Sequence, residues 1–251
     1  MSGYASMDID VECYSNVIPY WDNHRDIGRY SDHLTVWLDK YIGRPEESVK
    51  LKERFQTFIH PLNTISLEEL EFDEPCYQLE DPEILLKLKD TVYCLKPFFE
   101  IDACLEFIRN NVDKKIFFIS SGTMGEKIVP QIVGWPQIHS IYIFCGNISL
   151  HAKEWAMEYC EHITAMLDHQ DDLLLRLTKD IVNYLQEKGD HYLRLLENIR
   201  ARHCYAWAIK LTLRSRKLGT VNFRETHDVL MEKFRIVEEG YGTTKEQDSS
   251  S

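Results

Sequence analysis

The sequence predicts an α/β fold: a five-stranded parallel sheet, covered by helices on both faces and followed by a C-terminal helical extension. Two runs of β-branched and aromatic residues, 116–119 and 141–144, stop abruptly at Ser, Cys, Gly or Asn. Continuous apolar runs of this length are typical of strands buried on both faces, and small residues behind them suit tight turns into helices. Strand-like and helix-like segments also alternate between residues 34 and 167, which predicts right-handed crossovers between parallel strands.

The first part of the chain contains two of the predicted strands and an acidic insertion between them. The first strand is expected at 34–39, and an amphipathic helix at 46–59 follows the break at Gly43 and Pro45. Residues 61–90 carry nine acids and two bases, a local charge of −7 (2 − 9), and we expect them to loop out of the domain. The second strand is expected at 91–95.

The middle of the chain contains the other three strands and their connecting helices. Helical spacing of apolar residues predicts helices at 101–108, at 128–133 with a distortion at Pro130, and at 151–159. The strands are 116–119, 141–144 and 163–167. Five strands in strict alternation with helices suit the flavodoxin-like order 2-1-3-4-5.

The domain organisation follows from these segments. We expect a flexible N-terminal arm at 1–32, an α/β domain at 33–188, a helical extension at 189–238 that begins at the weak point Gly189, and a disordered tail at 239–251.

Composition narrows the class of protein. The net charge of −12, from 41 acids and 29 bases, argues against nucleic-acid binding, because affinity for phosphates comes from Lys and Arg. Seven cysteines without CxxC pairs and ten histidines without an HExxH pattern predict reduced thiols and no metal or other cofactor. Without a long apolar stretch or a secretory leader, the expected location is the cytoplasm, away from membranes.

In a doubly wound sheet, ligands bind at the carboxyl ends of the strands where the winding reverses, here between strands one and three. Glycines there allow close approach of a ligand, and the start of the next helix presents free N–H groups to a nucleotide or anion. Thr123 and Glu126 also have capping-box spacing, which would satisfy those donors internally. The ligand-binding candidates are Asp39, Lys40, Ser120, Ser121, Gly122, Thr123, Gly125, Cys145 and Gly146.

Four segments carry a family resemblance: VWLDKYIG at 36–43, IDACLEFI at 101–108, KIFFISSGTMGEKIVPQI at 115–132 and SIYIFCGNISLHAKEWA at 140–156. They resemble an N-terminal domain of large invertebrate proteins, where it precedes ADP-ribosyltransferase or tetratricopeptide modules. That domain is similar to response-regulator receivers and TIR domains. The modules themselves are not found in this chain, so the resemblance carries over no transferase activity.

The resemblance to receivers implies residues that this sequence lacks. A receiver has a phosphoacceptor Asp at the end of strand three, where this chain has Ser120 and Ser121, and a Lys after strand five, where it has 168–170, Asp-His-Gln. Aspartyl phosphorylation is therefore not expected, and the fold would be a degenerate receiver. Asp39 stands where receivers place magnesium ligands, although it also suits a turn or a helix cap.

Two catalytic alternatives stay open at this point. TIR-type cleavage of NAD needs a catalytic Glu, for which Glu126 and Glu100 are candidates by position, together with Asp39. Cys145, His169 and Asp168 follow neighbouring strands and could form a nucleophile, base and orienting acid, but a Cys at a strand end is usually a packing residue.

The segment 200–217 is basic and rich in aromatic and aliphatic residues. A helix of this kind can enter a partner's groove or lie on anionic lipid, or it can pair with the acidic insertion at 61–90 of the same molecule, which we favour. The partner-binding candidates are Arg200, Arg202, Trp207, Lys210, Arg214, Arg216 and Lys217. We expect a non-catalytic signalling or scaffolding module that binds proteins; the alternative is a TIR-like enzyme that processes NAD or a related nucleotide.

Overall fold

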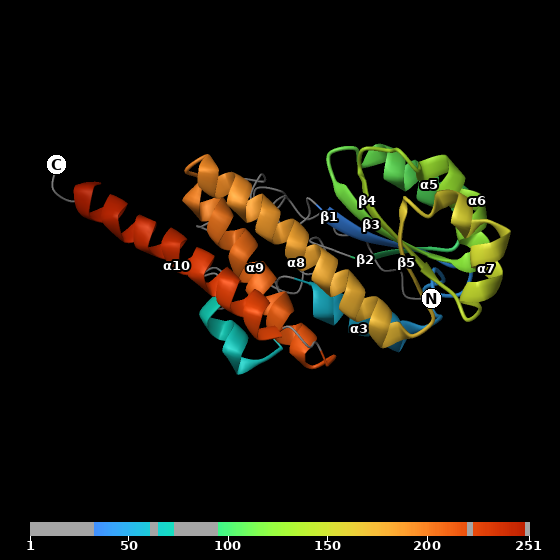
Figure 1. Cartoon of the computed structure of the whole chain (residues 1–251), viewed down its shortest axis with the longest axis horizontal. Helices are drawn as coiled ribbons and strands as arrows, with labels where there is room; N and C mark the ends of the chain where they lie inside the picture. Colours follow the sequence, from blue (N-terminus) through green and yellow to red (C-terminus); the bar gives the residue numbers. More distant parts are fainter. Residues whose placement is uncertain (1–32, 61–64, 73–94, 220–222, 249–251) are drawn as a thin grey trace, which may run out of the picture.

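The computed structural model describes residues 33–60, 65–72, 95–219 and 223–248. It forms a five-stranded, all-parallel sheet of order β2-β1-β3-β4-β5, flanked by helices (Figure 1). This confirms the predicted fold class and strand order. The strands are β1 (His33–Leu38), β2 (Leu95–Phe98), β3 (Lys115–Ser121), β4 (Ile138–Phe144) and β5 (Ile163–Leu167).

The three central strands are buried on both faces, as their continuous apolar runs predict. β1 is buried along its whole length, and successive side chains alternate between two separate cores. Val36 and Phe118 point to one core, and Trp37 and Phe117 to the other. The sheet is therefore the middle layer of three, and burial of both faces supplies the main driving force for folding.

One face of the sheet is covered by three helices in the order expected for right-handed crossovers (Figure 1). These are α5 (Ile101–Asn110), α6 (Gly122–Ile132) and α7 (Ile148–Glu154), and a short 3₁₀ helix, η4 (Ala156–Tyr159), follows α7. The single helix expected at 151–159 is interrupted at Trp155, whose φ of −149° is not helical. The interruption lets the indole of Trp155 turn into the core beside Ile143.

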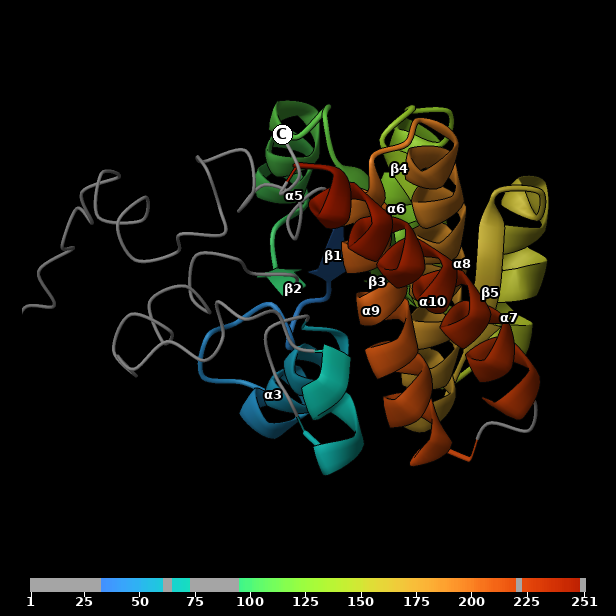
Figure 2. The ribbon, with the colours of Figure 1, turned by 90° about the vertical axis from the view of Figure 1, so that its left-hand side faces the viewer.

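The other face carries α3 (Val49–Ile59), α8 (Gln170–Arg194) and α9 (Asn198–Arg216), with a 3₁₀ helix, η2 (Leu67–Phe72), beside α9. α10 (Phe223–Asp248) packs on the outside of α9, and Figure 2, in which α10 is nearest the viewer, shows it crossing over that layer. Tyr205 and Trp207 of α9 share one core with Trp37, Phe117 and Tyr142 of the sheet. The C-terminal helices therefore pack on the sheet.

Three predicted boundaries differ from the structure. The second strand runs over 95–98 instead of 91–95, and residues 91–94 lie outside the described part of the chain. Pro97 is tolerated because β2 is an edge strand, where a missing N–H breaks no pairing.

The domain boundary expected at Gly189 falls inside α8, and the tail expected from 239 is helical as far as Asp248. The N-terminal arm at 1–32 lies outside the described residues.

Gly189 does not break α8 because its missing side chain makes room for a neighbour. A Cβ at this position would lie 2.5 Å from a ring carbon of Tyr205 on α9. The glycine at position 189 therefore marks a close contact between two helices and not the end of a helix. Contact of this closeness explains how α8 and α9 pack side by side along their length.

Candidate functional site

The predicted ligand-binding residues do come together at the carboxyl edge of the sheet. Register places Leu38 opposite Ser120, and Ser121 opposite Phe144. Asp39 and Lys40, which follow β1, and Cys145 and Gly146, which follow β4, therefore flank the segment 120–125 between them. The register thus places these residues at one edge of the sheet, as the strand order predicts.

Asp39 makes hydrogen bonds within its own turn and to β2. Its Oδ1 accepts hydrogen bonds from the amides of Tyr41 at 2.7 Å and Ile42 at 2.8 Å. Its backbone amide donates to the carbonyl of Phe98 at 2.9 Å, which ties the turn to β2. The arrangement is that of a turn residue, the structural alternative that the sequence also offered for Asp39. Lys40 extends over the ring of Tyr41.

The start of α6 differs from the capping box that the sequence suggested. The N-cap residue is Ser121, whose side chain makes no capping hydrogen bond, and the helix begins at Gly122. Thr123 and Glu126 are therefore both inside the helix, too late to form the box, and both side chains are exposed. Glu100, the other candidate acid, is an exposed N-cap residue of α5.

The space in front of the glycines is occupied by side chains of the same protein. A Cβ on Gly122 would lie 2.3 Å from the imidazole of His151, and one on Gly125 would lie 3.0 Å from Ile143 and 3.1 Å from Trp155. The indole N–H of Trp155 donates to Nδ1 of His151 at 3.4 Å. Both glycines thus allow close packing of α7 on α6, and the helix start expected to bind an anion lies beneath His151.

Cys145 does not form a catalytic group with His169. Burial raises the pKa of the Cys145 thiol; a hydrogen bond from the backbone of Asn147 opposes this rise, and the charge of Asp168 adds to it. The net effect is a raised pKa, so the thiol is protonated at neutral pH. His169 is the N-cap of α8, and its Nδ1 accepts the amide of Asp171 at 3.3 Å. Among the described residues no hydrogen bond joins Cys145 to His169. The thiol is therefore a packing group beside β5, whose Leu167 carbonyl accepts the Cys145 amide at 2.9 Å.

Three of the partner-binding candidates in 200–217, two bases and one aromatic residue, lie in the interior of the protein. Trp207, Lys210 and Arg214 are buried, which contradicts their role as surface residues for a partner. Nε and Nη2 of Arg214 donate to the Glu69 carboxylate at 3.0 and 2.9 Å, and both side chains have no exposed area. The Arg214 Nη1 also donates to the backbone carbonyls of Thr57, Phe58 and His60 at the end of α3.

The other bases of this segment pair within the same molecule. Arg216 contacts Glu68 at 2.5 Å, and Lys217 donates to the carbonyl of Ile65. Arg200 pairs with Glu197 at 2.7 Å and Arg202 with Glu238 at 2.6 Å. Pairing of this helix with the acidic insertion, the alternative favoured from the sequence, is therefore present at residues 65–69.

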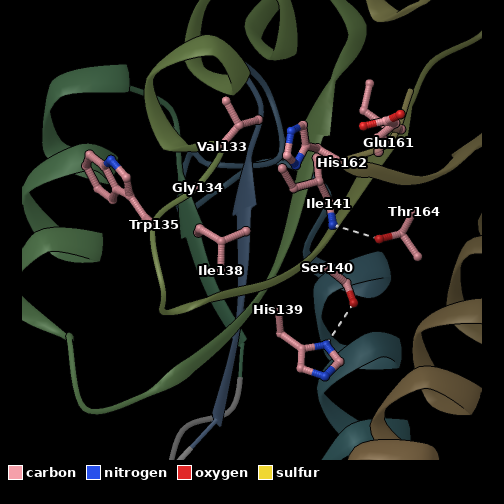
Figure 3. Close-up of a pocket in the computed structure, with 11 residues that line it drawn as sticks. Val133, Gly134, Trp135, Ile138, His139, Ser140, Ile141, Glu161, His162 and Thr164 are labelled. Atoms are coloured by element: carbon pink, nitrogen blue, oxygen red, sulfur yellow. Dashed lines mark hydrogen bonds between the residues drawn. The ribbon is translucent and has the colours of Figure 1, made fainter. Parts of the chain in front are cut away.

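Sequence reasoning missed a polar hollow of about 340 Å³ at the opposite edge of the sheet, between the amino ends of β4 and β5 (Figure 3). Both strands have a register shift there, beside His139 and beside Thr164. Oγ of Ser140 lies 2.9 Å from Nδ1 of His139, and the amide of Ile141 donates to Oγ1 of Thr164 at 3.1 Å. No sequence pattern marks these irregularities, because a register shift changes neither the composition nor the length of the strand-like runs.

The hollow is shaped by side chains from two turns. In Figure 3, Val133 and Trp135 lie on one side and Glu161 and His162 on the other. Burial lowers the pKa of His139, so this imidazole is neutral at physiological pH. Within the described ranges, no group of three or more His, Cys, Asp or Glu side chains is placed to hold a metal ion.

Comparison with known proteins adds no relative: no protein family, no curated protein and no solved structure matches the chain. The structure defines the class of the chain as a flavodoxin-like α/β protein with additional C-terminal helices. Of the helices in its described part, none combines the length and apolar composition that crossing a membrane requires.

Proposed function

We propose that the chain is a non-catalytic signalling or scaffolding module that acts by binding other proteins. The observation that carries this proposal is the close packing at the carboxyl edge, where His151 lies against Gly122 and Trp155 against Gly125, and one carboxylate oxygen of Asp39 is bound by its own turn. An enzyme that processes NAD in a TIR-like manner would need this space for its substrate. The kinship to degenerate receivers belongs to the same proposal and rests on the sequence alone.

Partner binding shifts in this proposal from α9 to α10, because the bases of α9 pair internally. Leu230 and Phe234 of α10 pack inward, whereas Val229 and Ile236 are 43% and 47% exposed on the other side. These two residues are two turns apart on one helix face. The exposed acids near them are Glu225, Asp228, Glu232 and Glu239, of which Glu232 and Glu239 pair with the exposed Arg235, so the surround keeps an excess of acids. The partner chemistry that fits is a groove with an apolar floor and a basic rim, which receives an amphipathic helix.

The test substitutes both apolar residues, Val229→Ser with Ile236→Ser, in the full chain. The control is Val112→Ser, at a position 69% exposed in the turn between α5 and β3. Proteins near the module are recorded by proximity labelling, and the affinity of each purified candidate for the three chains is then measured. We expect at least about tenfold weaker binding for the double variant, because two exposed aliphatic anchors are lost, and unchanged binding for the control. Equal binding by all three chains would reject α10 as the contact.

The enzymatic alternative is tested separately with purified full-length protein. NAD and nucleoside triphosphates are incubated with it, the products are analysed, and thermal unfolding is followed with each nucleotide. We expect no turnover and no thermal shift. Turnover that disappears in the Glu126→Gln variant would overturn the non-catalytic proposal, whatever the result at α10.

A further inference from the structure

The sheet has two edge strands, β2 and β5, which lie on opposite sides in Figure 2. An edge strand presents a row of backbone N–H and C=O groups that can pair with a strand of another molecule. β2 carries two residues that discourage such pairing, the charged Lys96 and Pro97, which has no N–H. β5 has neither a charged residue nor a proline, and each of its five residues is half-buried. Within the described part of the chain no strand pairs with its outer side, so β5 is the edge open to pairing.

The hydrogen bonds of β5 show which of its backbone groups face outward. The carbonyl of Leu167 accepts the amide of Cys145 at 2.9 Å, so the backbone groups of Leu167 face β4. The N–H and C=O of one residue point to the same side of a strand, and the side alternates along the chain, so those of Met166 face away from β4. Thr164, two residues earlier, is in the same phase, and the register with β4 passes over it. Thr164 and Met166 therefore supply the outer row of donors and acceptors.

A second copy of the same chain is the partner that fits this edge. Two identical edges related by a two-fold axis pair in antiparallel orientation. An axis at Ala165 includes the whole of β5 in the pairing, with Thr164 of one copy opposite Met166 of the other, so that outward backbone groups meet outward backbone groups. Ala165 has the smallest side chain of the strand, which allows the two backbones to approach at the axis.

The same axis brings complementary side chains together beyond both ends of the strand. His162 of one copy lies opposite Asp168 of the other, and Glu161 lies opposite His169; all four are exposed. Nδ1 of His169 accepts the amide of Asp171, so the neutral ring carries its hydrogen on Nε2, which can donate to a carboxylate. A displacement by one residue would place Glu161 opposite Asp168, and like charges directly opposite each other are destabilising. The charges therefore select the register centred on Ala165.

We propose that β5 is a self-association surface, through which two copies of this chain form a symmetric dimer with one continuous sheet of ten strands, five from each copy. The half-buried side chains add apolar contact on both faces of the sheet, Ile163 and Met166 on one and Ala165 and Leu167 on the other. A pairing of five residues makes a small interface, so the dimer is in exchange with the monomer. The inference goes beyond the contact proposed on α10 and does not depend on it.

The first experiment removes one outward N–H. Met166→Pro does to β5 what Pro97 does to β2, and it breaks no bond to β4; Met166→Val, which keeps the N–H, is the matched control. Sedimentation equilibrium of the full-length chains is measured in reducing buffer over about 1–500 μM, because small interfaces are weak. We expect the mass of the unmodified protein and of Met166→Val to rise from 29.6 kDa toward twice that value, and the mass of Met166→Pro to stay at 29.6 kDa.

The second experiment tests the axis and does not rely on the proline. The backbone groups of Ala165 face β4, so across the axis this residue meets its own copy as a non-hydrogen-bonded pair, with Cα atoms about 4.5 Å apart, a distance that a disulfide can span. Under mild oxidation Ala165→Cys should form a disulfide-linked dimer in clear excess over Ala103→Cys, an exposed position on α5, and over the unmodified chain with its exposed Cys160.

Three results would each overturn the proposal. They are a mass of one chain for the unmodified protein at every concentration, a dimer that persists in Met166→Pro, and cross-linking at position 165 that does not exceed cross-linking at position 103. A dimer that is lost in Met166→Pro and is trapped by Ala165→Cys supports both the surface and its register.

Discussion

The guanidinium of Arg214 joins three parts of the chain that are far apart in sequence. It belongs to α9, donates hydrogen bonds to the Glu69 carboxylate on η2, and donates to carbonyls at the end of α3, which have no partner within their own helix. Both charged groups are completely buried. Burial of an ion pair is costly, but loss of one partner costs more, because the other charge then stays buried without compensation.

Replacement of this arginine should therefore damage the fold. Arg214→Met is expected to lower the free energy of unfolding by about 3–5 kcal/mol, since it leaves the Glu69 carboxylate and several carbonyls unpaired. The control is Arg216→Met, whose ion pair with Glu68 is about half exposed, and whose loss should cost about 0–1 kcal/mol. Urea unfolding followed by circular dichroism measures both. Similar losses in the two variants would contradict the structural role of Arg214.

His33 should make the protein sensitive to acid. Burial lowers the pKa of this imidazole from 6.5 to about 3, so the unfolded chain binds a proton that the folded chain excludes between these values. Stability from this residue is present above pH 6.5 and is lost as the pH falls below it, by about 2 kcal/mol between pH 7 and pH 5. Burial lowers the pKa of His139 as well, which acts in the same direction.

The measurement compares unmodified protein with His33→Phe, which keeps a ring against Trp207, 4.6 Å away in the native structure. Urea unfolding at pH 7 and pH 5 should show that the variant loses about 2 kcal/mol less than the unmodified chain. Carboxylates contribute equally in both proteins, so the difference isolates the histidine. An identical pH dependence would mean that His33 is accessible to protons in the folded state.

At the scale of the elements, the contact between α8 and α9 depends on Gly189. An alanine usually stabilises a helix by about 1 kcal/mol relative to glycine, but here its Cβ would lie 2.5 Å from Tyr205. Tyr205 has little freedom to move, because it is buried and its hydroxyl donates to Asp190 at 2.7 Å. We expect Gly189→Ala to be destabilising by about 1–3 kcal/mol, the usual result of overpacking.

Gly146→Ala is the matched control for this prediction, because no atom lies within 4 Å of the Cβ position and the backbone needs no left-handed conformation. Its effect on the free energy of unfolding, measured in urea, should be within about 0.5 kcal/mol. If Gly189→Ala were neutral or stabilising, the two helices would have to be less closely packed than the contact with Tyr205 indicates.

The elements that the sequence predicts well are those whose signal is local. The runs 116–119 and 141–144 lie in strands because continuous apolar residues suit burial on both faces. β4 ends at Phe144 as expected, whereas β3 continues through Ser120 to Ser121. The errors arise where a distant residue decides. Gly189 looks like a helix end until Tyr205, sixteen positions later (205 − 189), occupies the space of its side chain. Lys210 and Arg214 look like surface charges in the sequence, but both are buried, and the partner of Arg214, Glu69, is 145 positions away.

The candidate site shows the same limit. Strand order alone brings Asp39, Ser121 and Cys145 to one edge, and that part was predictable. The contacts at this edge were not, because the imidazole of His151 lies against Gly122, which is 29 positions earlier in the chain (151 − 122). The hollow at the amino edge depends on two register shifts, which leave no periodic signal in the sequence.

At the scale of the whole molecule, the C-terminal helices and the sheet form a single folding unit. Phe117 and Tyr142 of the sheet belong to one continuous core with Leu177 of α8 and Trp207 of α9, and Leu230 of α10 closes that core from outside. A helical extension that can be removed without harm, as the predicted boundary at 188 and 189 implies, would leave this core open to water. Exposure of so many large apolar side chains costs more free energy than a domain of this size can lose.

Two truncations separate the alternatives. A chain that ends at residue 189 lacks the last residues of α8 and all of α9 and α10. It should lose cooperative unfolding and aggregate, because one face of the sheet has lost most of its cover. A chain that ends at residue 219 keeps α9 and loses only α10, so it should keep a cooperative transition at a lower urea concentration. Urea unfolding together with the dispersion of amide signals in solution measures both. A well-folded chain at 1–189 would mean that α8 and α3 alone cover the sheet, and that α9 and α10 form the separate extension expected from the sequence.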